Sequence, residues 1–217
     1  MTHRNIAAVV LWLIGALPSF SAAAVGVRAL SRTFSIFEIF AFRTGFGCPL
    51  LLAIALAQPG LRARLAPRRM PLHCLRNLVH FGATYAWGIG VTLLPLATVF
   101  ALEFTMPAWV ALLAVVILGE RMTASRATAI ACGFLGVIVI LRPGLEALQF
   151  ASFVVLASAL GFAITSIATK KLTATESTFS ILLWMNLMQL PLNLAGSAFG
   201  FWQRLEPSHV LPLAGVC

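Results

Sequence analysis

The 217-residue chain contains no aspartate at all, and its acidic side chains are six glutamates. Charged residues make up only 10% of the sequence, whereas a soluble domain carries about 25%. Hydrophobic residues make up 60%, and the mean hydropathy is +0.98. A water-soluble fold of this composition would expose large apolar patches and aggregate. The composition therefore predicts an integral membrane protein.

Motifs for metal binding and catalysis are also missing. The four cysteines form no Cys-x-x-Cys pair, which argues against a disulfide framework and a zinc site. The sequence has no HExxH, no GxSxG and no nucleotide-binding Gly-Lys-Ser/Thr loop. We therefore expect no enzyme, no cofactor and no metal; an integral membrane enzyme is the weaker alternative. The net charge of +9 indicates loops facing anionic lipid rather than nucleic acid, because the basic residues form no continuous face.

Long apolar segments predict an all-α fold of transmembrane helices. A span needs about 18–23 apolar residues to cross roughly 30 Å of hydrocarbon. Seven spans are expected, near 6–26, 35–57, 77–95, 97–118, 124–141, 149–169 and 179–200. Residues 206–217 resemble the approach to an eighth span. Most basic residues, including the cluster from Arg62 to Arg76, lie on one side of these spans, so the positive-inside rule places the N-terminus in the cytoplasm.

The chain contains an internal repeat. Residues 20–53 align with residues 162–195 without a gap, at an offset of 142 positions. Ten of the 34 aligned positions are identical, among them Pro49 and its counterpart Pro191. Five spans separate the two copies, so the second copy would cross the membrane in the opposite orientation. The pattern predicts an inverted-topology repeat, which is an architecture of secondary transporters.

The strongest local motif lies between residues 107 and 144. Its residues are Pro107, Gly119, Glu120, Arg121, Gly133, Gly136, Pro143 and Gly144. The Gly-Glu-Arg segment ends one helix, the two following glycines allow close helix approach, and Pro-Gly stops the next helix. With this motif the chain resembles the EamA family of the drug/metabolite transporter superfamily. The resemblance implies an inner-membrane carrier of ten helices, built from two inverted five-helix repeats, that moves small metabolites.

The chain departs from that family in its length, because two complete units at this period would need roughly 285 residues. We expect a complete five-helix unit over 1–142 and an incomplete second unit over 143–217, and therefore a C-terminal truncation. One interpretation is a fragment or a truncated gene product without transport activity. The other is a native seven-span protein that completes its bundle as a homo-oligomer, or a non-catalytic membrane subunit.

Two ionisable residues inside the spans are the first candidates for a site, because charge within a membrane is costly and usually functional. Arg43 lies about eight residues into the second span, and Glu103 about six residues into the fourth. Arg43 can bind an anionic group of a substrate, and Glu103 can take a coupling proton or a cationic substrate. The structural alternative is an ion pair of Arg43 with Glu38 or Glu103. Glu38 itself is expected to extend to water.

Aromatic and polar side chains supply further candidates. Tyr85 and Trp87 can line a cavity and stack on a flat or cationic ligand. Asn186 can face a polar pathway or join two helices, and His80 is expected to be a hydrogen-bonded residue at the membrane interface. Prolines that interrupt spans are candidates for helix kinks, as hinges or as tolerated breaks. They are Pro18, Pro49, Pro107 and Pro191.

These observations predict a multi-pass secondary transporter in the inner (cytoplasmic) membrane. It would move a small metabolite by alternating access, as one repeat rocks against the other. An arginine and a glutamate in the outer half of the membrane suit an amphoteric substrate, such as an amino acid or a nucleoside-like metabolite. The expected partners are this substrate and the lipid bilayer.

Overall fold

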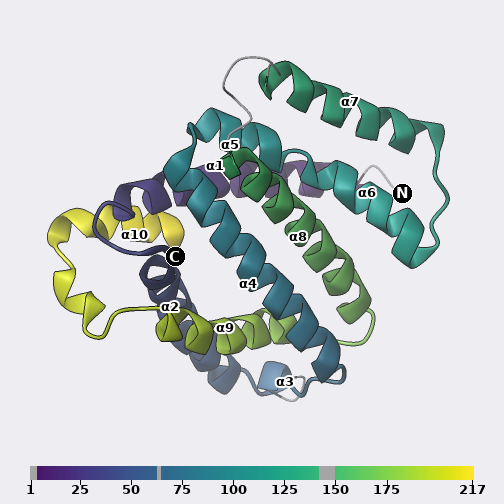
Figure 1. The fold of residues 1–217 in the computed structure, drawn as a ribbon. Helices are drawn as coiled ribbons and strands as arrows, with labels where there is room; N and C mark the ends of the chain where they lie inside the picture. Colours follow the sequence, from purple (N-terminus) through teal and green to yellow (C-terminus); the bar gives the residue numbers. More distant parts are fainter. Residues whose placement is uncertain (1–3, 63–64, 142–149) are drawn as a thin grey trace.

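The computed structural model describes residues 4–62, 65–141 and 150–217, and in these ranges its regular structure is entirely helical. Figure 1 shows long helices crossing one another, with the shorter ones at the edges of the bundle. The helices are α1 (Arg4–Leu30), α2 (Ile36–Ala57), α3 (Pro59–Arg62), α4 (Met70–Leu93), α5 (Leu96–Glu103), α6 (Met106–Leu118), α7 (Ala124–Leu141), α8 (Phe150–Leu172), α9 (Thr178–Ala195), η1 (Phe201–Arg204), η2 (Pro207–His209) and α10 (Val210–Val216).

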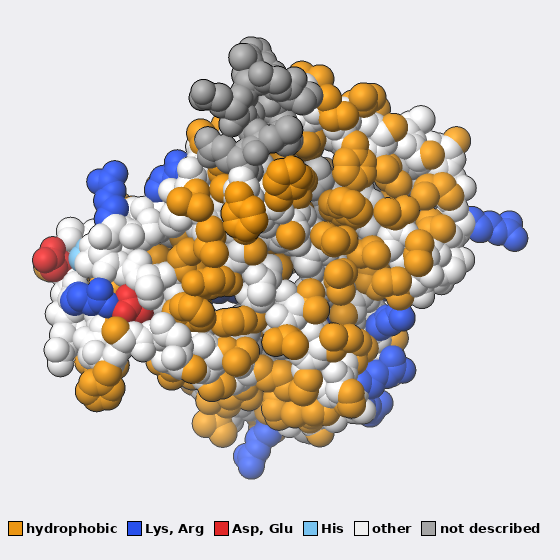
Figure 2. All heavy atoms as spheres, in the orientation of Figure 1, with side chains coloured by type: hydrophobic (Ala, Val, Ile, Leu, Met, Phe, Trp, Pro, Cys, Tyr) orange, Lys and Arg blue, Asp and Glu red, His pale blue; other side chains and the backbone are white. Residues whose placement is uncertain are grey.

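The described chain has four helical segments that are long and apolar enough to cross a membrane. They are Val10–Leu30, Ile36–Ala57, Leu96–Leu118 and Phe150–Leu172. The helices α4, α7 and α9 overlap the other three expected spans, so the count of seven spans stays a prediction. Figure 2 shows hydrophobic side chains over much of one face, with Lys and Arg at its margins. This surface fits a helical protein that is surrounded by lipid.

The two repeat copies begin their second helices in the same way. Ser35 caps α2 by accepting a hydrogen bond from the backbone N–H of Glu38, and Ser177 caps α9 by accepting one from Ser180. A serine at this position satisfies an N–H that the helix leaves free. The helices α2 and α9 pack against each other, as do α4 and α8, and α1 and α10. The inverted relation between the copies stays a prediction.

The expected span over residues 97–118 is divided into two helices. α5 ends at Glu103 and α6 begins at Met106, with Pro107 in its first turn. The Thr105 hydroxyl lies in this break, is fully buried, and donates to the carbonyl of Leu102 at 2.6 Å. Proline suits a first turn because its missing N–H has no helical partner there. The other three candidate prolines, Pro18, Pro49 and Pro191, lie inside α1, α2 and α9.

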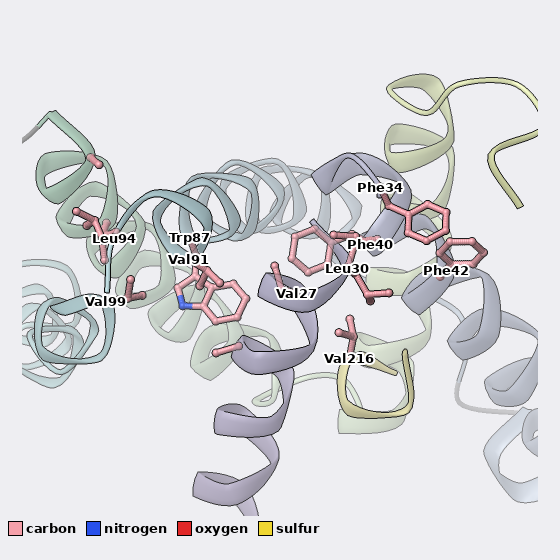
Figure 3. Packing of buried hydrophobic residues seen from close by; sticks show 14 of the residues in the cluster. Val27, Leu30, Phe34, Phe40, Phe42, Trp87, Val91, Leu94, Val99 and Val216 are labelled. Carbon is pink, nitrogen blue, oxygen red and sulfur yellow. The ribbon is translucent and has the colours of Figure 1, made fainter. Parts of the chain in front are cut away.

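A buried apolar cluster joins α1, α2 and α4, and Figure 3 shows Val27, Trp87 and Val91 within it. Close packing also holds α4 against α8. A Cβ on Gly161 would lie 2.8 Å from the Cβ of Ala83, and a glycine is therefore needed there. Small residues of this kind let helices in membranes approach closely. The contact fixes the position of α8 beside α4, and these two helices carry much of the cavity described next.

Candidate functional site

A cavity of about 450 Å³ lies among α1, α4, α5, α6 and α8. Its volume is within the range of about 300–1,000 Å³ that is usual for small-molecule sites. Six polar side chains and three apolar ones line it. The polar residues are Arg76, His80, Glu103, Thr165, Ser166 and Thr169, and the apolar ones are Phe20, Met106 and Phe162. A concentration of polar groups between apolar helices is the most unusual feature of this bundle.

The cationic side of the cavity comes from α4. Arg76 and His80 are four residues apart, so they lie on the same face of the helix. The Nε of Arg76 donates to the Thr169 hydroxyl of α8 at 2.9 Å, and Nη1 donates to the Asn77 side chain at 3.1 Å. A guanidinium has five N–H donors. Arg76 is therefore fixed against α8 while it retains donors for an anionic group.

Three buried polar atoms on His80 and Glu103 have no hydrogen-bond partner in the described part of the chain. They are Nδ1 and Nε2 of His80 and Oε2 of Glu103. The His80 ring lies against Phe162, with 5.5 Å between the ring centroids. The hydrogen-bonded interfacial histidine that the sequence suggested is therefore not what the structure shows. Buried polar atoms are costly when unpaired, so water, a proton or a ligand is expected to meet these atoms.

Arg43 does not line this cavity. It is half-buried on α2, and its guanidinium lies over the Phe40 ring at 5.7 Å. Among the described residues Arg43 forms no ion pair with Glu38 or Glu103, and Glu38 binds Arg204 instead. Glu38 is 3% exposed, so the expectation that it extends to water was wrong. Its position in the first turn of α2 lets it accept a hydrogen bond from the Ser35 backbone and pair with Arg204 across the fold.

The remaining candidates from the sequence take part in helix packing. Tyr85 stacks on Phe37, with ring centroids 4.5 Å apart, and Trp87 is buried in the apolar cluster. Asn186 lies against Gly47, where its Oδ1 would be 2.7 Å from an added Cβ. None of the three lines the polar cavity. A role for them in binding stays a prediction.

The motif around the end of α6 forms a contact with α8. Gly119 ends α6 with a φ of 68°, a left-handed conformation that glycine adopts without strain. Glu120 follows it and binds Lys170, with 2.6 Å between Oε1 and Nζ. Arg121 is exposed next to this pair. This part of the motif thus joins the end of α6 to α8 at the predicted cytoplasmic end.

The other motif residues divide into two groups. Gly133 of α7 faces Ala108 of α6, where an added Cβ would lie 3.8 Å from the alanine Cβ. Gly136 is exposed and has open space around it. Pro143 and Gly144 lie outside the described residues.

A buried acidic contact, which sequence reasoning did not find, lies at the same end as Lys170. Glu176, in the loop between α8 and α9, binds the Nε2 of His73 at 2.7 Å, and the side chains are 2% and 0% exposed. It also accepts hydrogen bonds from the backbone N–H groups of Arg68 and Arg69 at the start of α4. Burial opposes its ionisation, but these hydrogen bonds outweigh burial and hold the pKa of the Glu176 carboxyl below its ordinary value.

The long apolar helices of the described chain define this protein as a helical membrane protein. The chain belongs to the EamA-like transporter family, whose model matches residues 7–142. Members of this family are multi-pass membrane proteins. The family and its relatives point to a transporter rather than an enzyme.

Three curated relatives give the range of similarity. An S-adenosylmethionine uptake transporter of Rickettsia felis is 30% identical over 80% of this chain and 58% of its own length. The corresponding transporter of Rickettsia bellii is 27% identical over 88% and 65%. A riboflavin transporter of Rhizobium johnstonii is 29% identical over 84% and 61%. The chain thus spans about three-fifths of the length of these relatives.

One crystal structure of another protein also resembles this chain. It aligns with 92% of this chain and 72% of its own, with a TM-score of 0.58 and 18% identity. At that identity the likeness shows a shared fold alone.

Proposed function

We propose that the protein is a secondary transporter of a small amphoteric metabolite in the inner (cytoplasmic) membrane. The observation that carries the proposal is the single cavity in which Arg76, His80 and Glu103 meet inside a bundle of apolar helices. Ionisable groups in such a place are expensive, so a membrane protein retains them where they bind or move a solute. A substrate with both an anionic and a cationic group fits this pair of charges.

The polar groups of the cavity can bind different parts of the substrate. Arg76 is fixed by Thr169 and can hold a carboxylate or a similar anion with its free donors. Glu103, at the end of α5, can accept a cationic group or a coupling proton. The unpartnered nitrogens of His80 can complete either contact. The binding candidates from the structure are therefore Arg76 and Glu103, whereas the sequence analysis pointed to Arg43 and Glu103.

The arrangement of helices supports alternating access. At the repeat offset of 142 positions, α10 aligns with the beginning of α4, and α1 aligns with α8. The packing of α10 on α1 is then the counterpart of the packing of α4 on α8. A carrier with two such related halves moves one half against the other around a central site. The break between α5 and α6 gives the wall of the cavity a place to bend.

The similar proteins suggest which solute to test first. S-adenosylmethionine carries a carboxylate, an ammonium group and a nucleoside, so it belongs to the amphoteric class that the cavity favours. Transport of this compound by relatives that are about 30% identical makes it the first candidate here. Riboflavin is the second candidate because a relative at similar identity transports it.

Uptake into liposomes that contain the purified chain tests the proposal. We expect accumulation of labelled S-adenosylmethionine above that of empty liposomes. Arg76→Gln should lower the initial rate about tenfold, because one charge-assisted hydrogen bond contributes about 1.5–3 kcal/mol. Arg32→Gln, in the exposed loop between α1 and α2, is the matched control and should leave the rate unchanged. Equal uptake by Arg76→Gln and the wild type would refute the role of the cavity.

The alternative is that the chain is a membrane subunit without transport activity of its own. Liposomes that take up no amphoteric solute would support it. A homo-oligomer that supplies further helices would instead show uptake together with a crosslinked dimer or larger assembly.

A further inference from the structure

A second cavity, of about 490 Å³, adjoins the polar one and lies between α6 and α8. Met106 of α6 and Ser166 of α8 line both cavities. The two spaces are therefore neighbours, and these two side chains lie where they adjoin. Ser166 is half-buried and methionine is flexible, so both side chains can yield to a ligand that extends from one cavity into the other.

Fewer polar side chains line the second cavity than the first, although apolar atoms make up most of the surface of both. Its walls over most of their length are the apolar side chains of Val110, Ala111, Ala114 and Ile167. Small residues at two of these positions leave room for a flat group beside the helix. A space that is apolar and open to a polar neighbour suits one end of a molecule whose other end is charged.

The far end of the second cavity is closed by a polar contact. Lys170 and Glu120 line this end and pair with each other. Their side chains are 61% and 26% exposed, so the pair is partly in water and contributes little to holding the end closed. The two cavities together thus run from the buried charges toward the predicted cytoplasmic end, where a readily broken pair lies.

We propose that the two cavities form one elongated binding site for a two-part substrate. The polar cavity holds the charged, amino-acid-like end, and the apolar cavity holds a ring system of nucleoside size. Ala111 is the residue that sets the space for the ring. This inference rests on the proposed transport function, and it adds that the substrate joins both parts in one molecule. A free amino acid would fill only the polar half.

Binding to the purified full chain in detergent tests this inference, with the shift of the thermal unfolding midpoint as the signal. The three probes are methionine for the charged end, adenosine for the ring, and S-adenosylmethionine for both. S-adenosylmethionine should act at a concentration at least about tenfold below those of the two parts, since each cavity adds contacts. Ala111→Phe should weaken S-adenosylmethionine about tenfold and leave methionine unchanged, because the new ring fills the apolar half.

Two further variants serve as a control and as a smaller substitution at the tested position. Val116→Phe adds a ring on the exposed part of α6, where Val116 is 73% exposed, and should change no probe. Ala111→Val adds less volume and should weaken S-adenosylmethionine binding to a smaller extent. This variant takes the place of Ala111→Phe if the phenylalanine variant folds poorly.

The outcomes separate this inference from the proposed function. Equal binding of S-adenosylmethionine to Ala111→Phe and the wild type would overturn the inference. No shift with any of the three probes would also overturn it. Uptake of another amphoteric solute into liposomes, with loss in Arg76→Gln, would still leave the transport function standing.

Discussion

Replacing Glu176 should destabilise the junction between the two parts of the chain more than replacing any exposed glutamate. The Glu176 carboxylate accepts from the imidazole of His73 and from the backbone N–H groups of Arg68 and Arg69. The ionised carboxylate can only accept, so Nε2 of His73 must carry the proton. The carboxylate also lies at the N-terminus of α4, where the helix dipole favours negative charge.

The size of the effect follows from burial. Glu176→Ala leaves His73 buried and three donors without an acceptor, and breaking a buried pair in this way costs about 3–5 kcal/mol. Glu176→Gln keeps one acceptor oxygen and the shape but loses the charge. Neutral hydrogen bonds are about half as strong as charge-assisted ones, so this change should cost about 1–3 kcal/mol.

Denaturant unfolding of the purified chain in detergent measures both variants. Glu206→Gln is the matched control, because Glu206 is exposed, and it should lie within about 0.5 kcal/mol of the wild type. A double-mutant cycle with His73→Gln isolates the pair itself. If Glu176→Ala were no less stable than Glu206→Gln, the contact would not form in the protein and the argument would be refuted.

The same contact predicts a pH dependence. The folded state lowers the pKa of Glu176, so the folded carboxyl releases its proton more readily than the unfolded one. The resulting stability is complete above the ordinary pKa of a glutamate, and it is lost as the pH falls through the lowered pKa. The wild type should therefore lose more stability on acidification than Glu176→Gln does, when unfolding is followed across that range.

Three further changes test the packing and the helix ends. Gly161→Leu should lower the free energy of unfolding by about 1–3 kcal/mol and reduce uptake, because the added side chain meets Ala83 and separates α4 from α8. Unchanged stability in thermal unfolding would contradict this contact. Glu38→Gln should lower the free energy of unfolding by about 1–2 kcal/mol, because Glu38 is buried although its partner Arg204 is 45% exposed. Arg204→Gln should lower it by a similar amount. Ser177→Ala should cost about 1 kcal/mol through the lost cap of α9, whereas Ser177→Asp should retain most of the stability.

The positions of the helices were largely predictable, because span length and apolar composition are local properties of the sequence. α2 begins and ends close to its expected span, whereas α9 begins close to its own but ends at Ala195 instead of residue 200. Both start after the serines that the repeat aligns. The kink candidate Pro107 also lies close to the place where α5 gives way to α6. A local break of this kind follows from the missing N–H of proline and needs no knowledge of distant contacts.

The cavity was less predictable, because its groups come from helices far apart in the sequence. In the sequence, Arg76 is the last residue of the basic cluster that begins at Arg62. This cluster served only to place the N-terminus in the cytoplasm. The structure places it two turns into α4, beside His80. The spacing of four residues between them was the one sequence signal for a shared face. Glu176 had no such signal, because its partner His73 lies 103 positions away.

The contacts at the two ends of the bundle differ in a way that bears on how it can open. At the predicted cytoplasmic end, Glu176 and His73 are almost wholly buried. At the opposite end, Arg204 pairs with Glu38 but is 45% exposed, so water competes for it. The carboxylate is buried at both ends, however, because Glu38 is 3% exposed, and separating it from Arg204 would also leave a costly buried charge. Both contacts join distant parts of the chain, so each end would have to break the contact of a buried carboxylate in order to open.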